Sequence, residues 1–188
     1  PGRDPHQFLR DGVGGLLVAN GGIETRPESG RRKLSLDGMD SSIVRLATAS
    51  GELQGQWRVQ DRRLSLRHLA WSGRKLGNAM QAEHDRMEDR GAAPVLAAFD
   101  GRELQPAADS AGLAGYGGDI ARHGDGFAVS APRAGTVAFF DGEGRQLGRS
   151  PLAQACPLVD VAGELLAGGA DGAVVAGADR PPSRGRGR

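Results

Sequence analysis

The sequence predicts an all-β fold of the β-propeller class, with WD- or YVTN-like blades. Four apolar runs each lead into a glycine-containing turn and then into a second apolar segment. The runs lie at residues 43–46, 95–99, 137–140 and 173–177, of which the last is the least regular. A strand–turn–strand hairpin that repeats along a chain is typical of propeller blades. We therefore expect about four blades or part-blades in this chain.

Each blade needs further strands upstream of its hairpin. Apolar runs at residues 16–19, 127–130 and 165–168 are typical of strands buried on both faces. Before them we expect another strand with a polar residue near its start, and these residues are His6, His68, Asp119 and Asp160. They are 62, 51 and 41 residues apart, and the shortest spacing matches an unadorned blade of roughly 40–50 residues.

The two longer spacings require insertions, which the polar stretches at residues 21–40 and 84–93 supply. The second insertion can form one helical turn, and residues 104–115 are expected to hold another short helix. We assign residues 1–179 to a partial propeller domain. Residues 180–188, rich in arginine, glycine and proline, contain nothing apolar to bury and are expected to be disordered.

Charge and composition exclude several classes of function. The 188 residues carry a net charge of +1, but four arginines lie in the last nine residues, so the rest is slightly acidic. An acidic body gives no general electrostatic reason to bind nucleic acid, and no segment approaches the length of a membrane span. The single Cys156 excludes an internal disulfide, and its apolar flanks predict a buried, inert thiol.

The common catalytic motifs are absent from the sequence. It contains no Gly-Lys-Ser/Thr phosphate loop, no His-Glu-x-x-His, no Gly-x-Ser-x-Gly and no Cys-x-x-Cys. The residues alone therefore identify no reaction.

The polar residues at the strand starts are the first candidate site. In a propeller the innermost strands line a central channel, and their starts crowd together at one mouth. There His6, His68, Asp119 and Asp160 would offer the nitrogen and oxygen donors that divalent metals take. The alternative is that each side chain bonds to a neighbouring blade, which is the usual reason for a buried polar group.

Polar loops supply further candidates. Asn20, Glu24 and Lys33 lie in a long glycine-containing stretch, and such loops on rigid scaffolds commonly carry binding functions. A solvated loop whose charges pair among themselves explains the same residues. Gln81 opens a second polar cluster that suits a solvated loop, and Arg133 either presents a guanidinium to the channel or braces Asp119.

Four segments of the sequence resemble motifs of a bacterial family of unknown function. They lie at residues 17–25, 66–70, 115–120 and 130–135, and the Asn-Gly-Gly-Ile-Glu-Thr stretch is the most specific of them. The family consists of propeller-like periplasmic proteins, often exported by the twin-arginine route and often encoded beside imelysin-type iron-regulated proteins. The resemblance covers nearly all of residues 1–170.

The resemblance carries expectations of its own. Family members are about twice this length and are expected to close a ring of roughly seven blades, so this chain would be the C-terminal part of such a ring. The resemblance also implies a periplasmic location. Arg26 stands where the family motif is expected to have a histidine, which weakens a metal site in that loop.

Together these observations favour a periplasmic binding or scaffold protein that is not an enzyme, with a link to iron acquisition implied by the resemblance. Its partner would be a periplasmic protein or a small polar ligand. The candidate binding residues are His6, Asn20, Glu24, Lys33, Arg67, His68, Gln81, Asp119 and Arg133. The alternative is a lactonase-like hydrolase in which a divalent metal, held by His6, His68 and Asp119, activates water.

Overall fold

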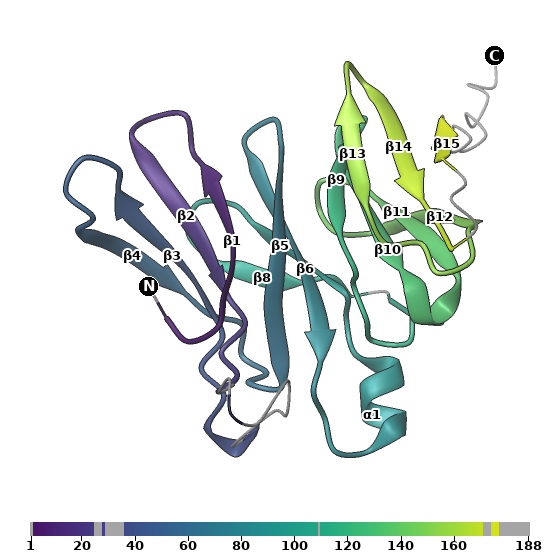
Figure 1. The fold of residues 1–188 in the computed structure, drawn as a ribbon, viewed down its shortest axis with the longest axis horizontal. Coiled ribbons are helices and arrows are strands. Elements are labelled where there is room, and N and C mark those ends of the chain that lie inside the picture. Colours follow the sequence, from purple (N-terminus) through teal and green to yellow (C-terminus); the bar gives the residue numbers. More distant parts are fainter. Residues whose placement is uncertain (1, 25–27, 29–35, 109, 171–173, 177–188) are drawn as a thin grey trace, which may run out of the picture.

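The protein is an arc of four antiparallel β-sheets (Figure 1). The computed structural model describes residues 2–24, 28, 36–108, 110–170 and the backbone of residues 174–176. In each sheet the strands are neighbours in chain order. This confirms the prediction of propeller blades.

The first two sheets contain four strands each. The first sheet consists of β1 (Pro5–Arg10), β2 (Gly15–Asn20), β3 (Ser42–Ala47) and β4 (Leu53–Trp57). The second consists of β5 (Leu64–Ser72), β6 (Lys75–Ala82), β7 (Leu96–Phe99) and β8 (Leu104–Pro106).

The third sheet has four strands and the fourth has three. The third consists of β9 (Ile120–His123), β10 (Gly126–Ala131), β11 (Thr136–Phe140) and β12 (Gln146–Pro151). The fourth consists of β13 (Leu158–Val161), β14 (Glu164–Gly168) and β15 (Val174–Ala176). The described helices are short and comprise η2 (Leu36–Gly38), α1 (Met87–Ala92) and η3 (Pro132–Ala134).

The Asp-Gly hairpins form for a local reason. The Asp141 carboxylate accepts hydrogen bonds from the backbone of Glu143 and Arg145, which fixes the turn between β11 and β12. Asp100 does the same for Arg102 and Glu103 between β7 and β8. Aspartate is favoured in turns because its side chain can replace a backbone acceptor in this way.

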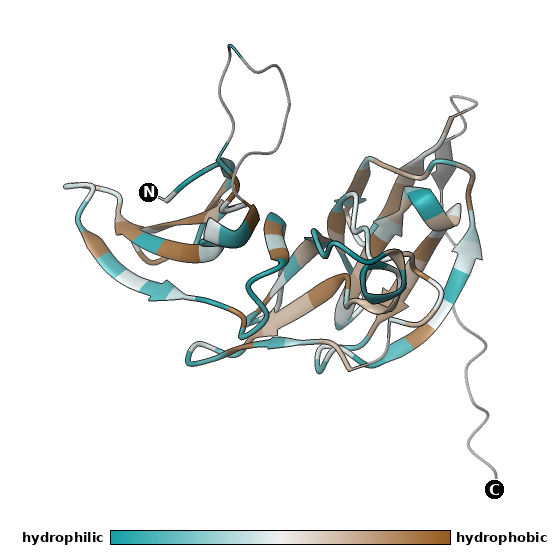
Figure 2. Ribbon diagram, turned by 90° about the horizontal axis from the view of Figure 1, so that it is seen from below, coloured by the Kyte–Doolittle hydropathy of each residue, from teal (hydrophilic) through white to brown (hydrophobic). Residues whose placement is uncertain are grey.

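The connections divide between two faces of the arc. Tight turns join β1 to β2, β5 to β6 and β9 to β10 at one face, which we call the turn face. The connections between the second and third strands of the first three sheets, which are long in the first two, gather with the linkers between sheets at the other face, which we call the loop face. In Figure 1 α1 lies at the lower end of the view and the tight hairpins point upward. Figure 2 shows that α1 and the connections are hydrophilic and that the hydrophobic residues concentrate in the strands.

Three apolar clusters hold the sheets together, one at each interface between successive sheets. Leu17 and Ile43 pack against Leu66 and other residues of the second sheet. A second cluster joins the second and third sheets, and a third joins the third and fourth. A Cβ atom on Gly77 would lie 2.7 Å from Ile120 and 2.8 Å from Phe127, so the second and third sheets approach too closely there for any larger residue.

The first strands of the sheets, β1, β5, β9 and β13, contact one another in chain order. Two polar side chains tie them together. The Gln7 amide donates to the Leu69 carbonyl (3.2 Å) and accepts from the Leu69 amide (2.7 Å). Asp119 accepts a hydrogen bond from the Leu158 amide at 2.9 Å. We call these contacts the inner-strand ties.

The two end sheets leave apolar side chains exposed. Side chains alternate between the faces of a strand, so Phe8 points away from the second sheet, toward which its neighbours Gln7 and Leu9 point. Phe8 is 56% exposed, and Val159 and Val161 of the last sheet are each 50% exposed.

Two expectations about local structure are wrong. Within residues 104–115, the described residues form β8 followed by turns instead of a helix, and Gly112 and Gly115 have left-handed backbone conformations that a helix does not contain. Cys156 is exposed, because its segment is held through its backbone. The Cys156 amide donates to the Gly168 carbonyl, and its carbonyl accepts from the Ser130 hydroxyl.

The tail at residues 180–188 lies outside the described residues. None of the helices in the described part of the chain has the length and apolar character that crossing a membrane requires.

Replacing Gln7 with alanine tests the inner-strand ties. Gln7→Ala removes both hydrogen bonds to Leu69 and leaves the part-buried amide and carbonyl of Leu69 without these partners. This loss should lower the unfolding free energy by about 1–2 kcal/mol. Gln105→Ala is the matched control, since this exposed amide bonds only to Glu103 among the described residues. Urea denaturation measures both, and equal stabilities would show that the tie contributes nothing.

Candidate functional site

Three of the predicted channel residues meet on the inner strands, near the loop-face ends of β1 and β9 and midway along β5. The rings of His6 and His68 are 5.0 Å apart and stand edge to face, at 78°. His68 Nδ1 lies 3.6 Å from Asp119 Oδ1. His6 comes from β1, His68 from β5, and Asp119 directly precedes β9, so three successive sheets build this inner-strand cluster of His6, His68 and Asp119.

Asp160 does not join the cluster. Its carboxylate accepts a hydrogen bond from the Gly163 amide at 2.9 Å, in the tight turn at the other end of β13. It also acts electrostatically on His123, which lies at the turn-face end of β9. The expected equivalence with Asp119 is wrong because β13 begins at Leu158, whose amide Asp119 binds.

Asp119 has two roles in the structure. One carboxylate oxygen receives the Leu158 amide and thus ties the third sheet to the fourth. The other accepts from the Ile120 amide at 2.9 Å and faces His68. The structural explanation of this residue is therefore confirmed, and the same carboxylate also orients toward the cluster.

Both imidazoles of the cluster are neutral at neutral pH. Burial, the positive charge of Arg67 and the neighbouring His68 lower the pKa of His6 to about 4, against an opposing effect of Asp4. Burial also lowers the pKa of His68, with Arg67 acting in the same direction and Asp119 opposing it. A neutral imidazole offers one donor and one acceptor nitrogen.

Arg67 lies beside the cluster as a largely buried cation. It is the extra residue of a bulge in β5 between Leu66 and His68, and bulges commonly re-aim a side chain. Its Nη1 lies 3.1 Å from Asp4 Oδ2, and its side chain is 9% exposed. Its Nε is buried without a hydrogen-bond partner in the described part of the chain. A Cβ atom on Gly21 would lie 2.5 Å from Asp4 Oδ2, so this pair fits closely under the Gly21 backbone.

Residues 116–119 bring two further candidates next to the cluster. The buried Gln81 side chain points to the Gly117 carbonyl at 3.4 Å, and Gln81 forms an isolated bridge with Tyr116. The exposed Arg133 guanidinium lies 4.2 Å from the centre of the Tyr116 ring, a cation–π contact. Arg133 therefore stacks on Tyr116, and no contact in the described part of the chain has it bracing Asp119. Sequence reasoning missed Tyr116, although it is the only tyrosine and lies within one of the resembling motifs.

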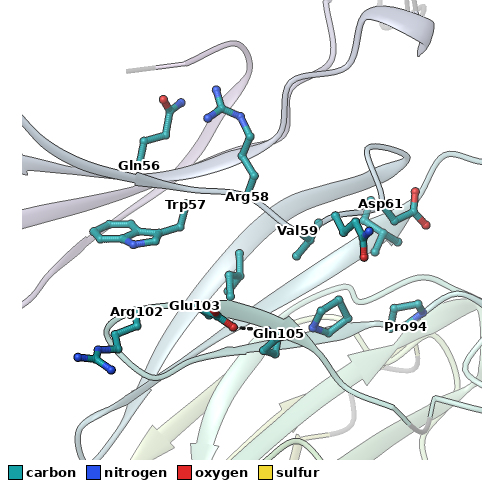
Figure 3. A pocket seen from close by; sticks show the side chains of 13 residues that line it. Gln56, Trp57, Arg58, Val59, Asp61, Pro94, Arg102, Glu103 and Gln105 are labelled. Atoms are coloured by element: carbon teal, nitrogen blue, oxygen red, sulfur yellow. Dashed lines mark hydrogen bonds between the residues drawn. The ribbon is translucent and has the colours of Figure 1, made fainter.

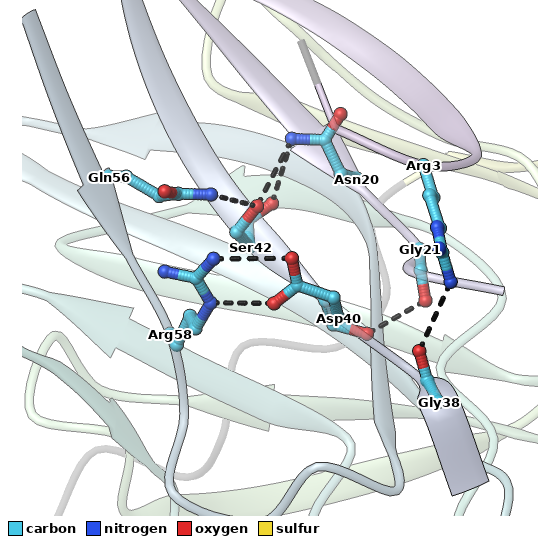
Figure 4. A network of polar contacts seen from close by, with 9 residues as sticks. Arg3, Asn20, Gly21, Gly38, Asp40, Ser42, Gln56 and Arg58 are labelled. Carbon is cyan, nitrogen blue, oxygen red and sulfur yellow. Dashed lines mark hydrogen bonds and ion pairs between the residues drawn. The ribbon is translucent and has the colours of Figure 1, made fainter. Parts of the chain in front are cut away.

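Asn20 is a structural residue. Its side chain is fully buried, accepts from the Gly2 amide at 2.9 Å and donates to the Ser42 carbonyl and hydroxyl at 3.3 Å each (Figure 4). Gln56 donates to the same hydroxyl, and an Asp40–Arg58 pair lies beside it. The specific Asn-Gly-Gly motif thus fixes the start of the long loop. Glu24 is half-buried beyond it, and Lys33 lies outside the described residues.

The predicted metal site gains no support from the side-chain arrangement. Across residues 2–24, 28, 36–108 and 110–170, no group of three or more histidine, cysteine, aspartate and glutamate side chains could hold a metal ion. His6, His68 and Asp119 supply a ring-to-ring contact and one long histidine–carboxylate approach instead. A divalent metal remains a prediction of the sequence.

A groove of about 840 Å³ lies between the outer strands of the first two sheets, where β4 faces β8 (Figure 3). Trp57 extends from one side, and Arg102, Glu103 and Gln105 lie on the other. None of the predicted site residues lines it, and no sequence motif marked it because its two walls are about 45 residues apart in the chain.

A family model of proteins of unknown function (DUF1513) matches residues 1–186. The chain belongs to this family. No curated protein matches the sequence.

Several solved propeller structures are similar to this member of the DUF1513 family in fold. BamB from Moraxella catarrhalis has a TM-score of 0.58 at 13% identity, over 91% of this chain and 42% of BamB. A gluconolactonase from Xanthomonas campestris has 0.56 at 19% identity, over 88% and 54%. A streptogramin B lyase has 0.55 at 11% identity, over 98% and 71%. The chain thus spans about half the length of the first two, and at these identities the likeness concerns the fold.

The lowered pKa of His6 gives a testable pH dependence. Because the folded pKa of about 4 lies below the unfolded value of 6.5, protons bind the unfolded chain first. The contribution of His6 to the unfolding free energy is therefore complete above pH 6.5 and is lost as the pH falls toward 4. Between pH 7 and pH 4.5 the unfolding free energy of the wild type should fall by about 1 kcal/mol more than that of His6→Asn. The difference is limited to this size because the imidazole is partly exposed to solvent. Urea denaturation at both pH values measures this, and identical losses would contradict it.

Gly22→Ala tests the structural role of the Asn-Gly-Gly motif. Gly22 has a φ of 74°, and a Cβ atom there would overlap the backbone of Asp40 and Ser41. Gly12 has a similar φ of 78° with nothing within 4 Å of such an atom, so Gly12→Ala is the matched control. We expect a cost of about 1 kcal/mol for the control and at least about 2 kcal/mol more for Gly22→Ala in thermal unfolding. An equal loss of unfolding free energy in the two variants would show that the backbone of Asp40 and Ser41 moves away from the new methyl group without a measurable penalty.

Proposed function

We propose that this chain is part of a binding or scaffold protein, not an enzyme, whose ligand docks at the loop face over the inner-strand cluster. The observation that carries the proposal is the convergence of His6, His68 and Asp119 from three successive sheets. A site shared by three sheets exists only when the arc is assembled, which is the usual arrangement for function on a rigid scaffold.

The chemistry of the cluster favours a small polar ligand that carries an anionic group. Neutral His6 and His68 each offer a donor and an acceptor nitrogen. Arg133 adds an exposed guanidinium held by Tyr116, and guanidinium groups match carboxylate geometry well. The buried Arg67 adds positive potential beside the histidines.

The resemblance of the motifs extends the proposal to compartment and partner. It supports a periplasmic location, a link to iron acquisition and a periplasmic protein as a possible occupant of the same face. It also supports a complete ring of roughly seven blades. Detection of the full-length protein in the periplasmic fraction tests the location.

Thermal stability in the presence of succinate and citrate tests the ligand class. Bound ligand stabilises the folded state by mass action, so saturating anion should raise the Tm of the wild type by about 2–4 °C. His68→Ala should lose this rise. His123→Ala is the matched control, since His123 lies at the turn-face end of β9, stacked on Phe139. No rise in the wild type, or an equal rise in both variants, would contradict the proposal.

The rival function is a metal-dependent hydrolase of the lactonase type, and metal content distinguishes it. A metal-activated water needs ligands that hold the ion in an open coordination site. We expect the purified protein, loaded with Zn²⁺, Mn²⁺ or Ca²⁺ and desalted, to retain less than one ion per chain. One retained ion per chain that is lost on His68→Ala would favour the hydrolase over the binding protein.

A further inference from the structure

Both tryptophans of the chain line one cleft on the turn face, opposite the inner-strand cluster. The cleft lies between the first and second sheets and has a volume of about 740 Å³. This volume is in the range of small-molecule binding sites. Its lining includes Arg45, Trp57, Trp71, Arg74 and Phe99.

The cleft has an aromatic wall. The rings of Trp57 and Phe99 are 4.7 Å apart and tilted by 54°, so side chains from β4 and β7, which belong to different sheets, meet there. Trp71 donates from Nε1 to the Arg10 carbonyl at 2.9 Å, which fixes its indole ring. Both indoles are half-buried, whereas Phe99 is buried. Tryptophan held rigidly with part of its ring accessible is typical of binding hot spots.

The rim of the cleft carries excess positive charge. Arg45 is neutralised by Asp11, whose Oδ2 lies 2.7 Å from Arg45 Nε. Arg74 has no acidic side chain within ion-pair distance in the described part of the chain. A cation beside an aromatic wall complements a planar ligand that bears a negative charge.

This combination does not follow from the fold. The corresponding cleft between the second and third sheets has a similar volume, about 780 Å³, but contains no tryptophan. Arg74 and Arg122 line this second cleft too, but its Lys75 pairs with Glu143, and Asp125 and Asp141 add negative charge at its rim. The cleft between the first two sheets therefore has its own composition.

We infer that this cleft binds a small aromatic carboxylate. The aromatic ring of the ligand packs on Trp57 and Trp71, and its carboxylate lies near Arg74. The inference is independent of the proposed function, since the two sites lie on opposite faces and share no residue.

The test uses ¹⁹F NMR titration of the full chain with 4-(trifluoromethyl)benzoate and its neutral analogue 4-(trifluoromethyl)benzyl alcohol. We expect the carboxylate to bind at least about 5-fold more tightly than the alcohol, the upper range for a partly exposed ion pair. Arg74→Gln should remove about this difference while leaving the alcohol unaffected, and Arg74→Lys should retain much of it. Trp57→Leu should weaken both ligands.

Arg122→Gln is the matched control, because Arg122 lies near the end of the next inner strand and its side chain bonds the Gly124 carbonyl. It should leave both affinities unchanged. Circular dichroism and the Tm of each variant separate loss of binding from loss of folding, and Arg74→Gln, at an exposed position, should keep the wild-type Tm. Equal affinity for the two ligands, no binding of the carboxylate, or equal effects of Arg74→Gln and Arg122→Gln would overturn the inference.

Discussion

Polar side chains that bind the backbone of the next inner strand hold the arc in register. Gln7 satisfies both backbone groups of Leu69, and Asp119 satisfies the Leu158 amide. Apolar packing between sheets is non-directional, whereas hydrogen bonds have a defined geometry, so these ties fix how far each strand slides along its neighbour. The inner-strand cluster depends on them directly, because His6 precedes Gln7, His68 precedes Leu69 and Asp119 is itself a tie.

The features that the sequence predicted well are those set by neighbouring residues. The Asp-Gly hairpins form through bonds within a few residues of Asp100 and Asp141, so the repeat predicted the strands and their order. The meeting of His6, His68 and Asp119 followed from the same repeat. The prediction that Asp160 joins them was wrong. The position of Asp160 along β13 is set by the hydrogen bond from the Leu158 amide to Asp119, and no local pattern encodes a contact between residues 39 apart.

Other features depend on contacts between distant segments and could not be predicted. Asn20 looked like a loop residue, yet it is buried because Ser42 and Gly2 converge on its amide. Arg133 stacks on Tyr116 instead of facing Asp119 because residues 116–119 pass between β6 and the third sheet. The burial of Cys156 was predicted from its apolar neighbours, but backbone bonds turn its side chain outward.

The position of His6 on the first sheet has a consequence for affinity. The first sheet has a neighbour on one side, through the cluster that contains Leu17 and Leu66, and it exposes Phe8 on the other. In stacked arrays each unit is stabilised by its interfaces with its neighbours. Separation of the first sheet from the second would remove His6 while His68 and Asp119 stayed in place. Occupancy at the loop face is therefore coupled to docking of the first sheet on the second, and any surface that covers Phe8, including a further blade of the proposed ring, would strengthen binding from a distance without touching the ligand.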